Sequence, residues 1–158
     1  MKNTFKRSGA ALISLVLLLV LAVSAGAASS QNVGVKFWKE RSDKESMANS
    51  GIDPDRTATL TRQANGTYTL TLPVMQVSKL GVTGYLSGLT IGDVTYDGTL
   101  TGDFNKATAV LTIKNLPASV LTGSDSNQAL AVTCSIKMDT ILLGDISTSA
   151  KMSIWVER

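Results

Sequence analysis

Few side chains in this sequence are of a type that performs covalent or metal chemistry. The 158 residues include no histidine and a single cysteine, Cys134. Catalytic triads built on histidine, histidine metal sites, cysteine-rich zinc clusters and a disulfide within the chain are therefore excluded. Cys134 lies in an alternating apolar run, 130–138, which favours a small core side chain over a reactive thiol. We therefore expect a protein that is not an enzyme.

Methionines and aspartates remain as candidates for chemistry. A thioether adapts to irregular surfaces and can bind low-spin iron, so Met47 could be a soft ligand or a lid over an apolar guest. The alternative, which we favour, is that Met47 pins a short helix to the rest of the domain. Met152 shares its face with Ile154 and Val156, which favours a core position. The aspartates fall in separate turns and lack the spacing of a calcium loop.

The two tryptophans offer a different kind of binding group. Trp38 and Trp155 both fall on the polar face of their expected strands. A tryptophan on such a face can anchor a ligand or a protein partner, or it can be half covered by a neighbouring loop. The sequence leaves both interpretations open.

The N-terminal residues have the pattern of a targeting signal. Three basic residues precede an apolar stretch from Ala10 to Val23, and Ala25-Gly26-Ala27 has the small-x-small pattern of a cleavage site. The apolar stretch is shorter than the roughly 20 residues that span a bilayer as a helix. We therefore expect residues 1–27 to be a cleaved signal peptide, the protein to be secreted or at the extracellular surface, and no membrane span to remain after cleavage.

Charge argues against two classes of partner. The full chain has 15 Lys and Arg against 12 Asp and Glu, and three of the basic residues lie in the expected signal peptide. Residues 28–158 are therefore balanced in charge. Without a basic cluster there is no electrostatic case for binding nucleic acid or an anionic membrane.

Alternating apolar residues and regularly spaced turn signals predict that residues 28–158 form one all-β domain. An Asn65-Gly66 turn and further Gly and Asp turns separate the alternating segments. This spacing is typical of an immunoglobulin-like β-sandwich, here of about eight antiparallel strands. The expected strands are 33–38, 56–62, 68–74, 82–91, 94–100, 107–114, 130–138 and 150–156.

One segment departs from the strand pattern. Ser42 and Glu45 have the Ser-x-x-Glu spacing of a helix capping box. Gly51 follows at a distance that suits a left-handed helix end. We therefore expect one short helix, of one or two turns, after the first strand.

The order of these features resembles the near-iron-transporter (NEAT) domain. The resemblance rests on Phe37-Trp38-Lys39 ending a strand, Ser46-Met47-Ala48-Asn49 in a short helix, Ala58, and the Asn65-Gly66-Thr67-Tyr68 hairpin. It extends in element order over most of residues 28–158. The family implies an immunoglobulin-like sandwich that holds haem between the short helix and the last β-hairpin, with a tyrosine of the last strand bound to iron.

The resemblance also implies a binding site. Ser46 and Met47 match the helix that covers one haem face, and segments 130–138 and 150–156 match the hairpin. The family's Tyr-x-x-x-Tyr pair is missing, because the corresponding stretch is 144–152 and no tyrosine follows Tyr96. The iron ligand would then be a methionine, Met47 or Met152, or a tyrosine from elsewhere in the chain. The candidate ligand-binding residues are Ser46, Met47, Trp38, Val132, Ile146 and Met152.

Two functions follow. The first is a secreted, non-enzymatic binding domain for haem or another small apolar ligand, which binds by burying the flat ring and passes haem onward readily. The second is a haem-free adhesion or structural module at the cell surface, which binds a protein or a glycan through its loops or tryptophans.

Overall fold

The structure is a computed structural model of the chain, and it describes residues 28–79, 81–140 and 144–158. The expected signal peptide, residues 1–27, lies outside the described residues. Within the described part, no helix is long and apolar enough to cross a membrane.

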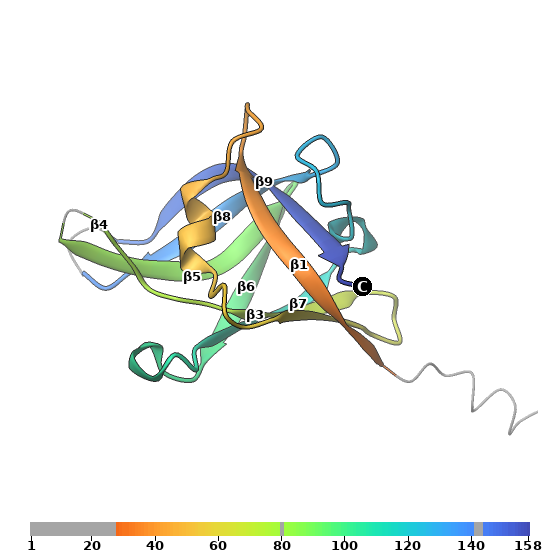
Figure 1. The fold of residues 1–158 in the computed structure, drawn as a ribbon, viewed down its shortest axis with the longest axis horizontal. Helices are drawn as coiled ribbons and strands as arrows, with labels where there is room; N and C mark the ends of the chain where they lie inside the picture. The colour runs from red at the N-terminus through yellow and green to blue at the C-terminus, as the bar shows by residue number, and fades with distance from the viewer. Residues whose placement is uncertain (1–27, 80, 141–143) are drawn as a thin grey trace, which may run out of the picture.

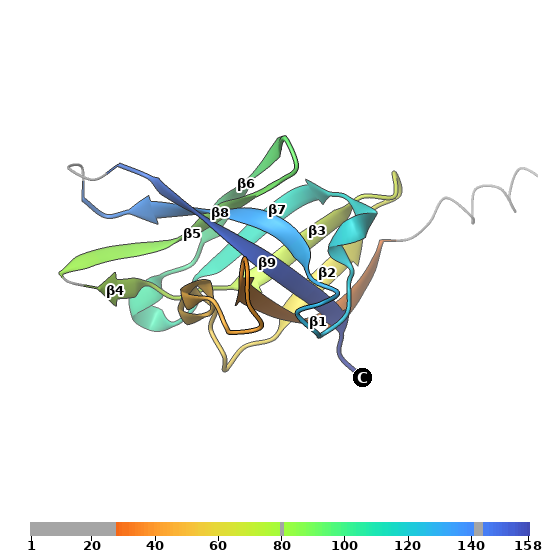
Figure 2. The ribbon, with the colours of Figure 1, turned by 90° about the horizontal axis from the view of Figure 1, so that it is seen from above.

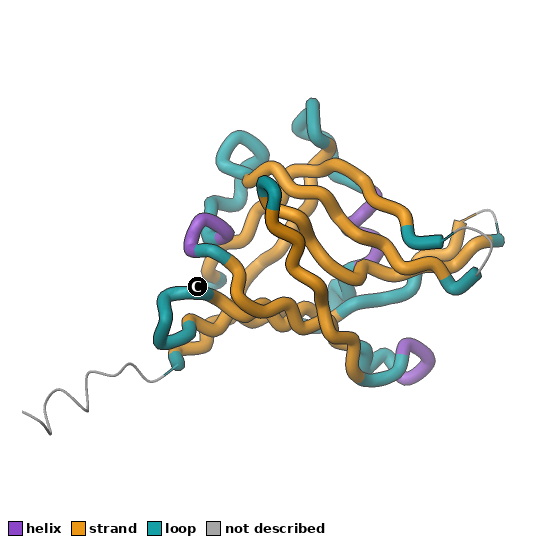
Figure 3. Tube along the Cα trace, turned by 180° about the vertical axis from the view of Figure 1, so that it is seen from behind, coloured by secondary structure: helices purple, strands orange, loops and turns teal. Residues whose placement is uncertain are grey.

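Nine strands and three short 3-10 helices make up the described chain, and the helices lie in connections between strands (Figure 3). The strands are β1 (Ser29–Lys39), β2 (Ala58–Arg62), β3 (Tyr68–Pro73), β4 (Val77–Lys79), β5 (Val82–Ile91), β6 (Val94–Thr101), β7 (Val110–Leu116), β8 (Leu130–Met138) and β9 (Ile146–Val156). The helices are η1 (Met47–Gly51), η2 (Phe104–Lys106) and η3 (Ala118–Val120).

The strands form one sheet that closes on itself. The hydrogen-bonded order is β4-β5-β6-β7-β3-β2-β1-β9-β8, and an additional pairing of β5 with β8 closes eight of the strands into a ring. All the pairings are antiparallel, and β4 is attached outside the ring to β5. The prediction of an all-β antiparallel fold is confirmed, but hydrogen bonding gives a closed, barrel-like sheet where two separate sheets were expected.

The closure depends on β5. Its pairing with β8 spans Gly84 to Thr90, and its pairing with β6 spans Gly88 to Ile91. A β-bulge between Leu86 and Gly88 lies where the two pairings begin to overlap. Bulges bend a strand and increase its twist. The bend allows one long strand to belong to both halves of what would otherwise be a sandwich.

The side chains that are buried alternate along the strands, as the sequence predicted. Leu70 and Leu72 of β3 are fully buried, as are Phe37 of β1 and Cys134 of β8. Burial of Cys134 raises the pKa of its thiol to about 12, so the thiol is protonated at neutral pH and unreactive. Cys134 is therefore a core residue, as its alternating neighbours predicted.

Several expected strand starts are wrong, and one strand was not predicted. Strand β7 begins at Val110 and not near 107, because Ala107 has a left-handed backbone that ends η2. Strand β9 begins at Ile146, four residues before the expected start, and β4 was not predicted at all. A strand of three residues is too short for a period-two pattern to be recognised.

The helix after the first strand is also capped differently from the prediction. Ser46 is the N-cap of η1, and its side chain accepts a hydrogen bond from the backbone N–H of Ala48. Ser42 instead accepts from the N–H of Lys44 within a local turn. Glu45 forms an ion pair with Lys36, so the expected capping box is absent. A 3-10 helix that begins later than expected takes the place of the predicted one.

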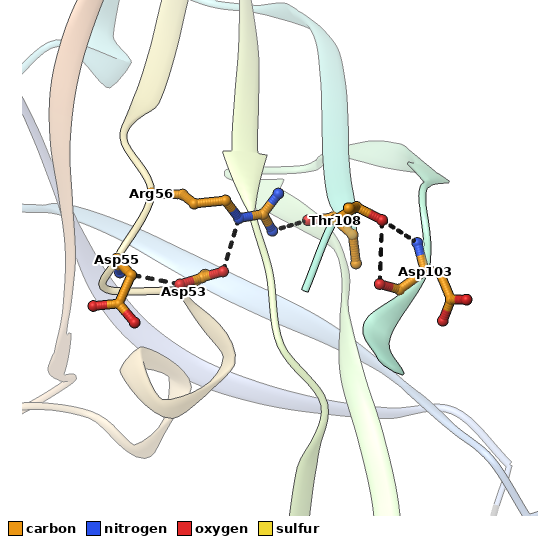
Figure 4. Close-up of polar contacts among 6 residues, drawn as sticks. Asp53, Asp55, Arg56, Asp103 and Thr108 are labelled. Carbon is orange, nitrogen blue, oxygen red and sulfur yellow. Dashed lines mark hydrogen bonds and ion pairs between the residues drawn. The ribbon is translucent and has the colours of Figure 1, made fainter. Parts of the chain in front are cut away.

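An ion pair with a buried carboxylate holds the chain that leaves η1. The Arg56 Nε donates to a carboxylate oxygen of Asp53 at 2.8 Å, and the same guanidinium donates to the carbonyl of Ala109 (Figure 4). The other Asp53 oxygen accepts from the N–H of Asp55 at 3.0 Å. The hydrogen bond from Arg56, and then that from Asp55, lowers the pKa of Asp53 below its usual range. This pair therefore ties the segment between η1 and β2 to Ala109, the residue before β7.

The first prediction concerns the acid stability of the fold. Because the pKa of Asp53 is lower in the folded than in the unfolded chain, its contribution is complete above the unfolded value of about 3.9 and is lost as pH falls through the folded value. We expect Asp53→Asn to lower the free energy of unfolding at pH 7 by about 1–3 kcal/mol and to flatten its decline below pH 4. Urea denaturation from pH 2.5 to 7 measures both effects.

The matched control is Asp55→Asn. The Asp55 carboxylate is exposed and only its backbone N–H takes part in the contact. Its stability profile should follow that of the parent protein, and equal losses in both variants would contradict the assignment to the ion pair.

Candidate functional site

One pocket stands out in the described part of the chain. It lies where η1 faces the β4–β5 and β8–β9 hairpins, which project together from the same end of the barrel (Figures 1 and 2). Its volume is about 300 Å³, at the lower end of the range for small-molecule sites. The lining residues are Ser46, Met47, Ala48 and Gly51 of η1 and its cap, Val77, Val82, Gly84, Tyr85 and Leu86 of β4 and β5, and Ile136, Met138, Ile146 and Thr148 of β8 and β9.

The pocket continues the inner face of the barrel beyond the core. On β8, the inner face runs from buried Cys134 to half-buried Ile136 and Met138. On β9, it runs from buried Ala150 to exposed Thr148 and Ile146. Every second residue of a strand shares a face, so one alternating stripe supplies both core and pocket wall. At the pocket, η1 and its cap lie over this face, because Ser46, Met47, Ala48 and Gly51 belong to the lining.

Asn49 holds η1 over this face. Beyond Val33, the edge of β1 that faces away from β9 no longer pairs with β2. There the Phe37 N–H donates to the Asn49 side-chain oxygen at 2.7 Å, and the Asn49 amide nitrogen donates to the Phe37 carbonyl at 2.7 Å. The Ser46 N–H donates to the same carbonyl at 2.9 Å. The side chain of Asn49 therefore takes the place of a neighbouring strand and docks η1 on β1.

The lining of the pocket is apolar and carries no charged side chain. The lining residues with polar side chains are Ser46, Tyr85 and Thr148, each of which carries a hydroxyl. The Ser46 hydroxyl already accepts from the N–H of Ala48 at 3.3 Å. A cavity of this kind binds by burying apolar surface and uses few polar contacts for orientation.

Two lining residues are held by neighbours. A Cβ added at Gly84 would lie 2.8 Å from the sulfur of Met138, so the thioether lies over the β5 backbone at this glycine. The ring of Tyr85 lies against Phe104, with centroids 5.2 Å apart. Both contacts position the pocket wall.

The structure brings together three of the six predicted site residues. Ser46, Met47 and Ile146 all line the pocket. Val132 and Met152 lie in the core, with exposed fractions of 5% and 0%. They share the inner face with the pocket residues but lie further into the barrel, where other strands cover them. Met152 is therefore a core side chain, as its position in the alternating pattern of the last strand also predicted, and it does not reach the pocket.

Trp38 lies away from the pocket. Its indole N–H donates to the hydroxyl of buried Ser153 at 2.9 Å, and the Lys36 ammonium lies 4.4 Å from the ring centroid. Trp155 covers Gly34, where an added Cβ would collide with the indole ring. Both tryptophans thus pack on the outer surface of the β1–β9 pair, in contacts within the domain.

Most of the β4–β5 wall was not predicted from the sequence. Gly84, Tyr85 and Leu86 belong to a strand that was predicted correctly, but its position opposite η1 depends on the closure of the sheet. The signal for Met138 was present, because it continues the alternating run that begins at Leu130. Within the described residues there is no group of three or more His, Cys, Asp or Glu side chains that could hold a metal ion.

The comparisons with known proteins bear on the fold. No protein-family model matches the sequence, and no curated protein matches it in sequence. Among solved structures, the chain is similar to the NEAT5 domain of IsdX2, a hemophore of B. anthracis, in complex with haem, with 11% identity and a TM-score of 0.54. It is also similar to a point mutant of that domain in complex with haem, with 10% identity and a TM-score of 0.53. Each match covers 84% of this chain and 99% of the other.

The fold is therefore that of a NEAT-like domain. The identity of 10–11% defines the fold alone. What the chain binds depends on the side chains of its own pocket.

Proposed function

We propose that the chain is a non-enzymatic binding domain for haem or a closely related flat, apolar ring, held in the pocket between η1 and the β8–β9 hairpin. The observation that carries this proposal is the place and lining of the pocket. An uncharged cavity opens between these two elements in a fold shared with haem-bound NEAT domains. Secretion through residues 1–27 completes the proposal and rests on the sequence pattern of that segment.

The residues fit the two parts of haem unequally. The apolar walls suit the porphyrin ring, because the affinity of such a site comes mainly from apolar burial. The pocket offers no usual iron ligand from β9. The β9 residues in its wall are Ile146 and Thr148, and neither side chain is a usual ligand of haem iron. Such a domain would bind haem reversibly and release it readily to an acceptor.

The alternative of a haem-free adhesion module draws no support from the tryptophans. The Trp38 indole N–H is already bonded to Ser153, and the Trp155 ring already covers Gly34. A platform for a glycan or protein would need these groups to face the partner. The pocket therefore favours the ligand-binding function.

The second prediction tests the pocket directly. Ile146 has an exposed fraction of 47% and lines the pocket, so a bound ring would cover its side chain. Ile146→Glu places a charge where the ring must bind and removes about 1.5–3 kcal/mol of apolar burial. We expect haemin to give a saturable, one-to-one change in the Soret band with the parent protein, and the variant to bind about 10- to 100-fold more weakly.

Val94→Glu is the matched control. Val94 is another exposed β-branched residue, with an exposed fraction of 53%, and it begins β6 outside the pocket lining. It should bind haemin like the parent protein. Equal weakening in both variants, or an unsaturable signal with the parent protein, would rule out haem binding in this pocket.

A further inference from the structure

We propose, resting on the proposed function, that this pocket recognises the porphyrin ring and not the metal, so that metal-free and metal-bearing porphyrins bind with nearly equal affinity. The ligand class is therefore the tetrapyrrole ring in general. Three features of the pocket support this proposal: the side chains that could bond iron, the wall opposite η1, and the charge of the lining.

The side chains that bind haem iron in proteins are those of histidine, cysteine, methionine and tyrosine. The chain has no histidine. Cys134 and Met152 are both 0% exposed and lie in the core, so neither sulfur reaches a ring in the pocket. Among the lining residues only Met47, Tyr85 and Met138 belong to these types.

Two of these three side chains already have a position that serves the fold. The sulfur of Met138 lies over Gly84, and the ring of Tyr85 lies against Phe104. Met47 is the first residue of η1 and has an exposed fraction of 57%, so most of its side chain is in contact with solvent. To bond iron strongly, a side chain must be held at the ring axis by its neighbours. Here the neighbours hold Met138 and Tyr85 against β5 and η2.

The wall opposite η1 points to the same conclusion. The inner-face positions of β9 that line the pocket are Ile146 and Thr148, followed by buried Ala150. None of these side chains carries a thioether, a thiol, an imidazole or a phenol. The ring is therefore covered on this side by aliphatic and hydroxyl groups.

The charge of the lining also gives no preference for a metal-bearing ring. No lining residue is charged, so the site does not compensate the charge of a bound ferric ion. Carboxylate substituents of the ring must remain at the solvent-exposed mouth, because burying an unpaired charge is costly. Apolar burial of the ring is then the common source of affinity, and it is the same with iron, with zinc or with two protons at the centre.

The experiment compares three ligands with the purified protein. Haemin is titrated by Soret absorbance, and protoporphyrin IX and its zinc complex are titrated by their fluorescence. We expect the three dissociation constants to agree within about threefold, and protoporphyrin IX to displace haemin with one-to-one stoichiometry. Haemin that binds tenfold or more tightly than the metal-free ring, equivalent to about 1.4 kcal/mol, would overturn the inference.

Three conservative variants provide a second test, which does not depend on the ratio of the haemin and protoporphyrin IX dissociation constants. Met47→Leu, Met138→Leu and Tyr85→Phe preserve size and remove the atom that could bond iron. In each, we expect the haemin affinity to change by the same factor as that of protoporphyrin IX, and the spectrum of bound haemin to stay as in the parent protein. A variant that weakens haemin alone would identify an iron ligand and refute the inference.

The two proposals fail in different ways. If none of the three rings binds saturably, the proposed function itself fails. If haemin alone binds, the proposed function stands and the inference about the ring fails. Ile146→Glu provides the remaining check, because it should weaken all three ligands by a similar factor if they share the pocket.

Discussion

Asn49→Ala is expected to lower the free energy of unfolding by about 2–3 kcal/mol and to weaken haemin binding at the same time. The variant leaves the Phe37 N–H on the unpaired edge of β1 without its acceptor and removes one of two donors to the Phe37 carbonyl. A buried donor that loses its partner costs about 1–3 kcal/mol. Because the same side chain docks η1, the wall of the pocket that contains Met47 moves with it.

Two further variants separate these effects. Asn49→Asp keeps an acceptor for the Phe37 N–H but brings a carboxylate close to the Phe37 carbonyl. At neutral pH its free energy of unfolding should therefore be no higher than that of Asn49→Ala. In acid, where the carboxyl group is protonated, part of the lost stability should return. Ser50→Ala changes the exposed neighbour in η1 and should leave both properties unchanged. Urea denaturation and haemin titration at pH 5 and 7 measure the series. Stability at the parent level in Asn49→Ala would show that the Asn49 contact does not hold η1.

Thr148→Tyr is expected to turn a site that recognises the ring into one that also recognises iron. Thr148 lines the pocket on the inner face of β9, opposite η1, and its side chain is exposed enough for a larger group. A tyrosine phenolate is an established ligand of haem iron. We expect haemin to bind at least about tenfold more tightly than to the parent protein, a gain of about 1.4 kcal/mol, while protoporphyrin IX changes by less than threefold.

Ser149→Tyr is the control for this variant. Ser149 is the adjacent exposed residue of β9, and alternation places it on the outer face of the sheet. It should leave both ligands unaffected. Equal gains for haemin and protoporphyrin IX in Thr148→Tyr would mean that the new ring adds apolar surface and not an iron bond.

The sequence by itself determined the class of fold and the composition of the core. The alternation around Phe37, Leu70, Cys134 and Met152 predicted which side chains are buried, because a strand exposes its two faces in turn whatever its neighbours are. The ranges 82–91 and 130–138 were predicted to the residue for the same reason. The absence of histidine is a property of composition alone, and it excludes histidine-based catalysis and histidine metal sites in any fold.

Only the tertiary structure decided which of these apolar residues form a site. Period two places Val132, Met138, Ile146 and Met152 on inner faces alike, yet Met138 and Ile146 line the pocket while Val132 and Met152 are core. The difference arises from what lies opposite each position, and that depends on the β5–β8 pairing that closes the sheet and on the Asn49 contact that docks η1. Both join residues far apart in the chain, and local periodicity carries no information about such pairings.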